Sequence, residues 1–402
     1  MSVPEALAEL TRGAVDVVSR EDLEERLGTG RPLRVKAGFD PTRPDLHLGH
    51  TVLLEKLRAF QELGHEVVFL IGDFTARVGD PTGQNEQRPR LTREQVMAAA
   101  ATYQEQAFKV LDRARTTVRY NGEWLERLSL VEVVELAAKR TLARTLERRD
   151  FRERFDAERD IHLHELLYPL LQGYDSVALE CDVELGGTDQ LFNLMVGRDL
   201  MRSSGQRPQI VMTTPLLEGL DAKVADGRVV GKKMSKSADN YVGIDEPPVA
   251  IYRKCMQVDD RVVRRWFDLL SRLPTRAIDE LFAAGDPLAA KHALAAELVG
   301  RYHGAAAAEA AAAEFRGTYL GIGIPTELEL VEIGTAPVVL ARALAQAGLC
   351  ASNSDARRQI TQGGVELDGA RVTDEWLELG PGEYVVRVGS KNRRFRRFRV
   401  GS

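Results

Sequence analysis

The sequence predicts an α/β protein: a parallel sheet covered by helices, followed by a helical domain and a small α+β module. Short apolar strands at Leu33–Phe39 and Glu66–Ile71 alternate with a helical stretch from about Gly49 to Leu63. Such alternation is typical of a parallel sheet with helices on its faces. The pattern changes after Ser237, where strands give way to helices.

Further elements complete the first half. A helical stretch runs from about Thr92 to Arg113, Asn121-Gly122 marks a turn, and helical patterns resume over Val131–Glu147. Val177–Leu185 is a further strand candidate that leads into Gly186-Gly187. We therefore expect a Rossmann-like domain whose ligand loops follow the carboxyl ends of its strands.

The second half is predicted to be helical and then mixed. Pro247-Pro248 opens a run of helices that reaches about Gly317, and its stretch Ala305–Ala313 has strong helix propensity. Gly317–Pro337 has the composition of a linker, and Val338–Ser402 suggests two helices followed by hairpin strands. The expected division is an α/β domain, a helical domain, a linker and an α+β module over residues 1–230, 231–320, 321–336 and 337–402.

Composition excludes several classes of protein. Of 402 residues, 44% are hydrophobic and 29% charged, which is typical of globular rather than disordered chains. No apolar run approaches the ~20 residues of a membrane helix, and the acidic N-terminus lacks a signal-peptide core, so we expect a cytoplasmic protein without a membrane partner. The three cysteines are scattered. They predict a reducing compartment, no disulfide framework and no protein-bound metal.

The net charge is −5, but the charge is unevenly distributed. Arg387–Arg399 contains seven basic residues and no acidic one, with Phe395 and Phe398 between them. A basic segment with interleaved aromatic residues is a local electrostatic footprint for RNA. The alternative is an edge strand that charged side chains keep soluble.

The loop after the first strand carries two histidines. Lys36–His50 reads KAGFDPTRPDLHLGH, and its prolines hold the chain away from helix until His47 and His50 begin the next one. Imidazole donors at the positive end of a helix suit a polyphosphate, and Gly49 allows a nucleotide to approach the backbone. For this motif alone, two histidines that cap a helix are the alternative. A Walker sequence is absent, so any nucleotide site is of another class.

A second motif, KMSKS, places Lys233 and Lys236 in a loop flanked by Gly and Ser. Such a loop can close its lysines onto pyrophosphate in the transition state and open for product release. A solvated basic loop is the alternative, but HLGH and KMSKS in this order indicate that the two motifs act on the same ATP. Nucleotidylyltransferases, which have the first motif without the second, are the nearest chemical alternative. Both use an anionic oxygen to displace pyrophosphate from the α-phosphate.

Tyr168, Gln172 and Asp175 are spaced i, i+4, i+7, so on a helix they share one face. Packing explains such a polar stripe poorly, and interhelical hydrogen bonds are the alternative. Pro169 within this segment is tolerated best if it falls in the first turn of the helix. Two Gly-rich polar segments, at 72–83 and 186–190, follow strands, where this fold binds ligands.

At these residues the chain resembles the bacterial tyrosyl-tRNA synthetases, a family of class I aminoacyl-tRNA synthetases. The matching segments, in family order, are GFDPTRPDLHLGH, GDFTARVGDPTG, YPLLQGYD, GGTDQ and KMSKS. The C-terminal CASNSDARRQITQGGVELDG resembles an RNA-binding module shared with a small-subunit ribosomal protein. The resemblance spans nearly the whole chain.

The resemblance implies a role for each matching residue. Residues expected to hold the substrate ammonium are Asp80, Tyr168 and Gln172. Those expected at the carboxylate and the hydroxyl of the amino acid are Gln190 and Asp175. Those expected to line the adenylate pocket and the ribose site are Asp40, Gly49, Gly187 and Asp189. Those expected to contact the ATP phosphates are Thr42, His47, His50, Arg88, Lys233 and Lys236.

Two positions depart from the family pattern. Many members place a tyrosine, a second partner for the substrate hydroxyl, where this chain has Lys36, so we expect Lys36 at that end of the amino-acid site. Gln84 stands where some members carry a basic phosphate ligand, which shifts charge stabilisation onto Arg88 and the KMSKS lysines. Both departures indicate a sub-branch of the family.

The C-terminal module is expected to contact RNA. Asn353–Gln362 is predicted to be a helix with Ser352 or Asn353 as its cap; Arg357 and Arg358 lie on it and Arg342 on the preceding helix. Arginine suits phosphate because its fork binds two oxygens in a fixed geometry. RNA contact by these three arginines rests on the resemblance rather than on their number.

The resemblance implies a tyrosine–tRNA ligase that converts L-tyrosine and ATP to tyrosyl-adenylate and pyrophosphate and then esterifies the terminal ribose of tRNA(Tyr). Mg²⁺ would accompany the ATP. The related tryptophan enzyme is disfavoured by Asp175 and by the RNA module, and a silent RNA-binding paralogue is disfavoured by intact HLGH and KMSKS. The family acts as a homodimer, with the contact expected near Asn121–Glu147.

Overall fold

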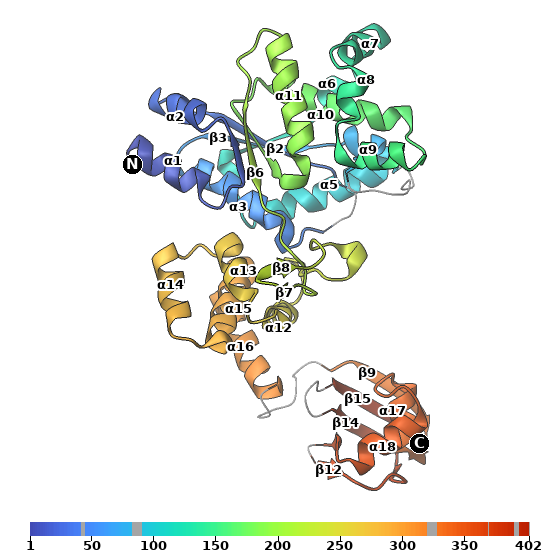
Figure 1. Cartoon of the computed structure of the whole chain (residues 1–402). Coiled ribbons are helices and arrows are strands. Elements are labelled where there is room, and N and C mark those ends of the chain that lie inside the picture. Colours follow the sequence, from blue (N-terminus) through green and yellow to red (C-terminus); the bar gives the residue numbers. More distant parts are fainter. Residues whose placement is uncertain (42–44, 83–90, 320–327, 369, 390–393, 402) are drawn as a thin grey trace. The chain divides into compact units, whose positions relative to one another are not determined.

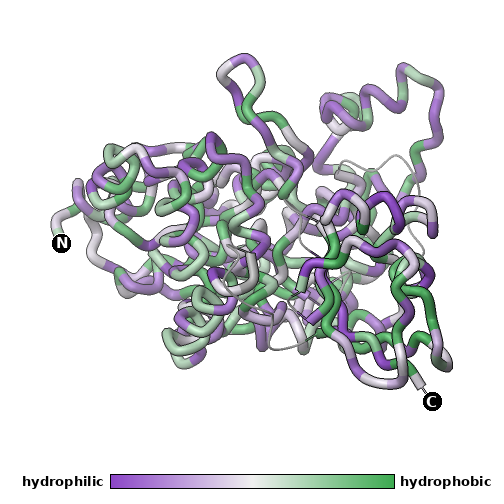
Figure 2. Tube along the Cα trace, turned by 90° about the horizontal axis from the view of Figure 1, so that it is seen from below, coloured by the Kyte–Doolittle hydropathy of each residue, from purple (hydrophilic) through white to green (hydrophobic). Residues whose placement is uncertain are grey.

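The computed structural model describes residues 1–41, 45–82, 91–319, 328–368, 370–389 and 394–401. These residues form two compact units, Met1–Ala308 and Glu309–Ser402. Among them no helix is both long and apolar enough to cross a membrane. Hydrophilic and hydrophobic residues instead alternate along the trace (Figure 2).

The first unit is built on a six-stranded sheet in the order β1-β6-β5-β2-β3-β4. Its strands are β1 (Asp16–Val18), β2 (Arg34–Phe39), β3 (Glu66–Ile71), β4 (Thr116–Tyr120), β5 (Val183–Gly187) and β6 (Ile210–Thr214). β1 is antiparallel to β6, and the other pairs are parallel. The order reverses between β2 and β5, and open α/β sheets bind ligands at the carboxyl ends of strands at such a point. The predicted Rossmann-like domain is confirmed.

Helices lie on both sides of this sheet (Figure 1). They are α1 (Val3–Thr11), α2 (Arg20–Gly28), α3 (Leu48–Glu62), α4 (Thr75–Val78), α5 (Arg93–Ala107), α6 (Gly122–Leu125), α7 (Leu130–Ala138), α8 (Leu142–Thr145), α9 (Arg149–Asp156), α10 (Leu163–Leu179) and α11 (Leu191–Ser203). Residues 67–71 of β3 are all buried, as expected for a parallel strand with both faces covered.

The boundaries of α10 correct one prediction and place Pro169. Residues 177–179 are helical and not strand, and β5 begins only at Val183. Glu180, whose left-handed φ of 48° ends the helix, separates the two. Pro169 lies well inside the helix, because a capping box between His162 and Glu165 starts it six residues earlier. The proline is therefore accommodated in the helix interior and not in the first turn, where it is tolerated best.

The predicted run of helices follows the KMSKS segment. It comprises α12 (Pro248–Gln257), α13 (Val263–Leu270), α14 (Thr275–Ala283), α15 (Pro287–His303) and α16 (Ala305–Tyr319). A hairpin of β7 (Lys223–Ala225) and β8 (Arg228–Val230) precedes the KMSKS segment. Ion pairs tie these helices to the Rossmann-like part: Glu55 on α3 accepts from Arg272 at 2.8 Å and from Arg301 at 3.1 Å.

The C-terminal unit is the predicted α+β module. Its elements are β9 (Leu330–Thr335), β10 (Val338–Val339), α17 (Leu340–Gln346), α18 (Asn353–Thr361), β11 (Val365–Leu367), β12 (Ala370–Val372), β13 (Glu378–Leu379), β14 (Gly382–Val388) and β15 (Arg394–Gly401). Leu344, Ile360, Val386 and Phe398 are among its fully buried core residues. The order of the larger sheet is β12-β11-β14-β15-β9.

This sheet changes two expectations. Most of the predicted linker's second half is β9, which pairs in parallel with β15. The basic strand β15 is therefore not an edge strand, because it lies between β14 and β9. Its Phe398 is fully buried, and Arg399 pairs with carboxylates on both neighbouring strands, Glu383 at 2.8 Å and Glu332 at 3.0 Å. Much of the positive charge of this strand is thus balanced within the sheet.

Candidate active site

A cavity of about 1250 Å³ opens at the carboxyl ends of the parallel strands. Residues that follow β2, β3 and β5 line it, including Asp40, Gly72 and Asp189, and so does the first turn of α3. The loop after β6 and the KMSKS segment complete the wall. The cavity therefore occupies the switch point of the sheet, where a ligand is expected.

The HLGH histidines are hydrogen-bond donors that face this cavity. Nδ1 of His47 accepts the backbone N–H of Gly49, and Nδ1 of His50 accepts that of His47, each over 3.2 Å. Because both Nδ1 atoms accept, each neutral ring carries its proton on Nε2. Burial lowers the pKa of His47 to about 2 and that of His50 to about 4, and the charges of Lys236 and Lys233 add to both decreases. Both rings are therefore uncharged donors at neutral pH.

The KMSKS lysines line the same cavity and are paired with carboxylates there. The ammonium of Lys233 lies 2.9 Å from Oδ2 of Asp189, and that of Lys236 lies 2.8 Å from Oδ2 of Asp45. Met234 between them is buried. The segment thus brings two movable cations opposite the helix end that carries the histidines.

Two glycines are required by close packing at this point. A Cβ on Gly49 would lie 3.0 Å from the His47 ring and 3.6 Å from Cβ of Met234. A Cβ on Gly187 would lie 2.8 Å from Oδ1 of Asp189. A side chain at Gly49 would therefore press on the His47 ring, whereas Met234 of the KMSKS segment lies at an ordinary contact distance.

The polar stripe of α10 lines the other end of the cavity. Tyr168, Gln172 and Asp175 all contribute to its wall, as does Asp40 from the end of β2. The hydroxyl of Tyr168 donates to Oδ2 of Asp40 over 2.8 Å. The helix therefore presents its three polar groups to the cavity.

A chain of amides and charges connects Gln172 to Asp80. Asn193 on α11 donates to Gln172 over 2.9 Å and to Gln190 over 3.0 Å. Gln190 in turn donates to Oδ2 of Asp80 over 2.8 Å. The guanidinium of Arg148 lies 3.7 Å from Asp80 and donates to Asn193 over 3.2 Å. These five side chains are thereby linked in one polar network.

Asp175 is held by two donors from the turn after β4. The indole N–H of Trp124 donates to its Oδ1 over 2.8 Å, and Nδ2 of Asn121 donates to its Oδ2 over 3.3 Å. The carboxyl is 2% exposed. Burial raises its pKa to about 7, although the charge of Lys36 and the two hydrogen bonds oppose the increase. A second buried carboxyl, Asp40, behaves similarly: burial raises its pKa to about 7.

Sequence reasoning missed several of these residues. Asn121 was interpreted only as part of a turn, although it directly follows a parallel strand, β4, where this fold binds ligands. Asn193 stands three residues after Gln190, one helical turn away, which is a signal that was available. Trp124 and Arg148 carry no comparable signal, because their partners are distant in sequence.

Lys36 does not line the cavity, which differs from its expected place beside the substrate. Its ammonium lies 2.7 Å from Oε1 of Glu184 on the neighbouring strand, and the two side chains are 1% and 2% exposed. The physical reason is that the strand turns Lys36 toward an anionic partner below the cavity floor. Thr42 and Arg88, and the departure at Gln84, lie outside the described residues.

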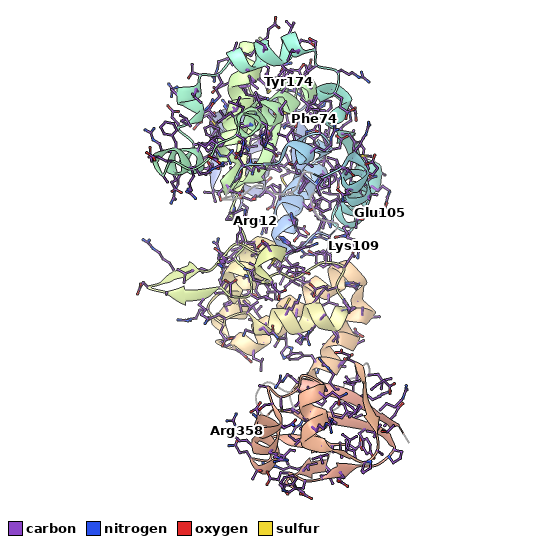
Figure 3. The ribbon with its side chains drawn as sticks, turned by 90° about the vertical axis from the view of Figure 1, so that its right-hand side faces the viewer. Arg12, Phe74, Glu105, Lys109, Tyr174 and Arg358 are labelled. Carbon is purple, nitrogen blue, oxygen red and sulfur yellow. The ribbon has the colours of Figure 1, made fainter. Side chains whose placement is uncertain are left out.

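The three arginines predicted to contact RNA are in the C-terminal unit. Arg342 lies on α17, and Arg357 and Arg358 lie on α18. Arg358 points outward (Figure 3) and pairs with Asp355 at 2.6 Å. The guanidinium of Arg357 lies 3.8 Å above the ring of the exposed Trp376.

Within the described parts of the chain, no group of three or more His, Cys, Asp or Glu side chains is arranged to hold a metal ion. Four carboxylates of the cavity are engaged with lysines, an amide or a hydroxyl: Asp40, Asp45, Asp80 and Asp189. The donor set fits recognition of a charged organic ligand.

The protein families that match this chain and the individual proteins similar to it agree with each other. The family described as "tRNA synthetases class I (W and Y)" matches residues 29–319, and the S4 domain matches residues 340–384. The tyrosine–tRNA ligase of Geobacter metallireducens is 52% identical over 409 residues and 99% of each chain. That of Thiobacillus denitrificans is 52% identical over 98% of this chain and 99% of its own.

Solved structures give the same result at lower identity. A C-terminally truncated mitochondrial tyrosyl-tRNA synthetase of Coccidioides posadasii is 28% identical, with a TM-score of 0.62 over 77% of this chain and 91% of its own. The tyrosyl-tRNA synthetase of Archaeoglobus fulgidus, complexed with L-tyrosine, is 26% identical, with a TM-score of 0.61 over 77% of this chain and all of its own.

Proposed function

The chain belongs to the tyrosine–tRNA ligases, a family of class I tRNA synthetases, and from this premise we propose how its residues divide the work. The activity has two steps. A carboxylate oxygen of tyrosine attacks the α-phosphorus of ATP and pyrophosphate leaves, which forms tyrosyl-adenylate. A hydroxyl of the terminal ribose of tRNA then attacks the acyl carbon and AMP leaves.

One end of the cavity has side chains suited to the ammonium, the carboxylate and the phenol of tyrosine. Asp80, Tyr168 and Gln172 hold the ammonium, Gln190 lies at the carboxylate, and Asp175 accepts from the phenol. The observation that carries this proposal is the position of Asp175: a buried carboxyl at the cavity wall, held by Trp124 and Asn121. A buried acceptor selects a substrate with a hydroxyl, because leaving it unpaired is costly.

The other end suits ATP. Neutral His47 and His50 donate from Nε2 at the positive end of α3, which stabilises the phosphates without a titration step. Asp189 binds the ribose against Gly187, and Asp40 lines the adenylate pocket. Thr42 and Arg88 are assigned to the phosphates by family resemblance alone.

We propose that the KMSKS lysines exchange partners during catalysis. Their acceptors in the present structure are Asp189 and Asp45. Pyrophosphate is a stronger anion, so Lys233 and Lys236 would transfer to it as charge develops on the leaving group. Transfer of Lys233 would also free Asp189 for the ribose.

Mg²⁺ would accompany ATP, held through phosphate oxygens and water. The cavity fits this arrangement, because its carboxylates Asp40, Asp80 and Asp189 are each engaged by protein donors. When bound, the ion neutralises charge on the phosphates.

We propose that the C-terminal unit binds the cognate tRNA through Arg342, Arg357 and Arg358, since its S4 match covers all three. We also propose a homodimer. Apolar side chains on and near α7 are unusually exposed: Leu130 by 80%, Val131 by 66% and Val134 by 61%. A second copy would cover them. Such a synthetase would work in the cytoplasm.

Exchange of labelled pyrophosphate into ATP tests the amino-acid assignment. Exchange with tyrosine, and far less with tryptophan or phenylalanine, is the expected result. Exchange driven by tryptophan would assign the chain to the related enzyme. Absence of exchange with all three would leave a protein that only binds RNA.

A further inference from the structure

Lys36 and Glu184 form a fully buried ion pair directly below the cavity floor. They are partners in the parallel pairing of β2 with β5, so their side chains point to the same face of the sheet. Two residues further along β2, on that same face, Gly38 lines the cavity. Lys36 therefore lies one step deeper than the substrate site, roughly 7 Å along the strand.

Glu184 of this pair accepts a hydrogen bond from α10, the helix that carries Asp175. Oε2 of Glu184 accepts from Ser176 over 2.7 Å and from Gln209 over 2.8 Å. Ser176 is the neighbour of Asp175 on α10. Glu184 is thus anchored on its far oxygen, and its near oxygen fixes the ammonium of Lys36 at 2.7 Å.

The charges around Asp175 are unbalanced without Lys36. The anionic or ionisable groups that act on this region are Asp40 just after β2, Asp80, Tyr168 on α10, Cys181 just before β5, and Glu184 on β5. Among the described residues, Lys36 is the cation that acts on Asp175 in the opposite direction. A buried ion pair rarely adds stability over well-packed apolar residues, so retaining one at this place requires another reason.

We propose that Lys36 is a positioning residue for tyrosine selection: with Glu184 it sets the charge of Asp175 from below, without itself contacting the substrate. The proposal rests on the assignment of Asp175 to the phenol. An ionised Asp175 is a strong acceptor for the phenol, and it is costly to leave unpaired against phenylalanine. A protonated Asp175 discriminates less.

The electrostatic interactions of Lys36 and Asp175 agree with this role. Burial lowers the pKa of Lys36, but the charges of Glu184, Cys181 and Asp175 raise it by more, so the ammonium stays charged. The positive charge of Lys36 lowers the pKa of Asp175, and the negative charge of Glu184 raises it. The two members of one ion pair therefore act on Asp175 with opposite signs.

The opposite effects of Lys36 and Glu184 on the pKa of Asp175 allow the proposal to be tested with variants. The variants are Lys36→Met, which removes the cation, Glu184→Gln, which removes the anion, and Ser176→Ala, a control that removes a contact of Glu184 without changing charge. The measured quantity is kcat/KM for tyrosine divided by kcat/KM for phenylalanine in pyrophosphate exchange, between about pH 5 and about pH 9. Effects of Asp40 and Asp80 cancel in this ratio, because both amino acids have the same ammonium and carboxylate.

In the wild type the ratio should fall as the pH falls through the pKa of Asp175. Lys36→Met should move this midpoint to higher pH and Glu184→Gln to lower pH, while Ser176→Ala leaves it in place. A displacement of one pH unit changes the ratio up to about tenfold on the acid side. If Lys36→Met does not fold, the downward displacement in Glu184→Gln supports the proposal alone.

Midpoints that move in the same direction, or do not move, would show that the pair is only structural and would overturn the proposal. Tyrosine-dependent exchange in the wild type distinguishes this failure from failure of the proposed function. If the wild type shows no such exchange, both are overturned.

Discussion

The indole N–H of Trp124 donates to Oδ1 of Asp175 over 2.8 Å, which ties the turn after β4 to the middle of α10. Asn121 in the same turn donates to the other oxygen of that carboxyl. The acceptor proposed for the substrate phenol is therefore oriented by a turn 51 residues away in sequence. Tyrosine recognition depends on this turn as much as on the helix.

Trp124→Phe should weaken tyrosine binding while ATP binding stays close to normal. The change removes the hydrogen bond to Asp175 and keeps an aromatic ring. A hydrogen bond to a charged group contributes about 1.5–3 kcal/mol, so a loss of roughly tenfold to a hundredfold is expected in equilibrium dialysis with tyrosine. Trp376→Phe, in the C-terminal unit, is the matched control. Equal tyrosine affinity in wild type and Trp124→Phe would disprove the orienting role.

Lys233→Ala should slow adenylate formation by about 10²–10³-fold, the usual effect of removing one group that stabilises a transition state. Tyrosine binding should change little, because the lysine pairs with Asp189 at the nucleotide end of the cavity. Rapid-quench measurement of adenylate together with equilibrium binding separates the two effects. Lys223→Ala, on the exposed β7, should change neither. Losses of equal size in both measurements would contradict the transition-state role.

Asp40→Asn should stabilise the empty enzyme at high pH but not at low pH. The pKa of Asp40 is raised to about 7 from an ordinary 3.8, so the folded state binds the proton more tightly than the unfolded state. Ionised Asp40 therefore destabilises the fold above about pH 7, and the penalty disappears as the pH falls toward the unfolded pKa. Thermal unfolding should show a higher Tm for the variant near pH 8.5, by roughly 2–4 °C for each kcal/mol, and a clearly smaller increase near pH 5. The same increase at both values would mean that the charge is not the cause.

Val134→Asp should dissociate the proposed homodimer. The side chain is 61% exposed on α7, and a charge there would be buried without a partner at a subunit contact. Sedimentation velocity should show half the mass of the wild type. Val230→Asp, at a comparably exposed position on β8, should leave the mass unchanged. A wild type that already sediments as a monomer would refute the dimer.

Periodicity and strand order allowed much of the site to be predicted. The i, i+4, i+7 spacing of Tyr168, Gln172 and Asp175 requires only a helix, and all three line the cavity. Asp40 and Asp189 follow parallel strands, whose carboxyl ends meet at one edge. Local rules of this kind do not depend on how distant segments pack.

Contacts between distant segments could not be predicted in the same way. The approach of Lys36 to Glu184 depends on β2 pairing with β5, 148 residues later in the chain. Likewise, the linker composition near Gly317–Pro337 gives no sign that β9 pairs in parallel with β15. Register between distant strands is set by the packing of the whole domain, which single-sequence patterns do not report.

The account as a whole depends on Asp175 as the acceptor for the phenol. The most direct test is pyrophosphate exchange by Asp175→Ala with tyrosine and with phenylalanine, at a pH where the wild-type carboxyl is ionised. Removing a buried acceptor should lower the preference for tyrosine by about fivefold to more than a hundredfold, since an unpaired buried polar group costs about 1–3 kcal/mol. An unchanged preference, with exchange otherwise intact, would contradict the assignment of Asp175.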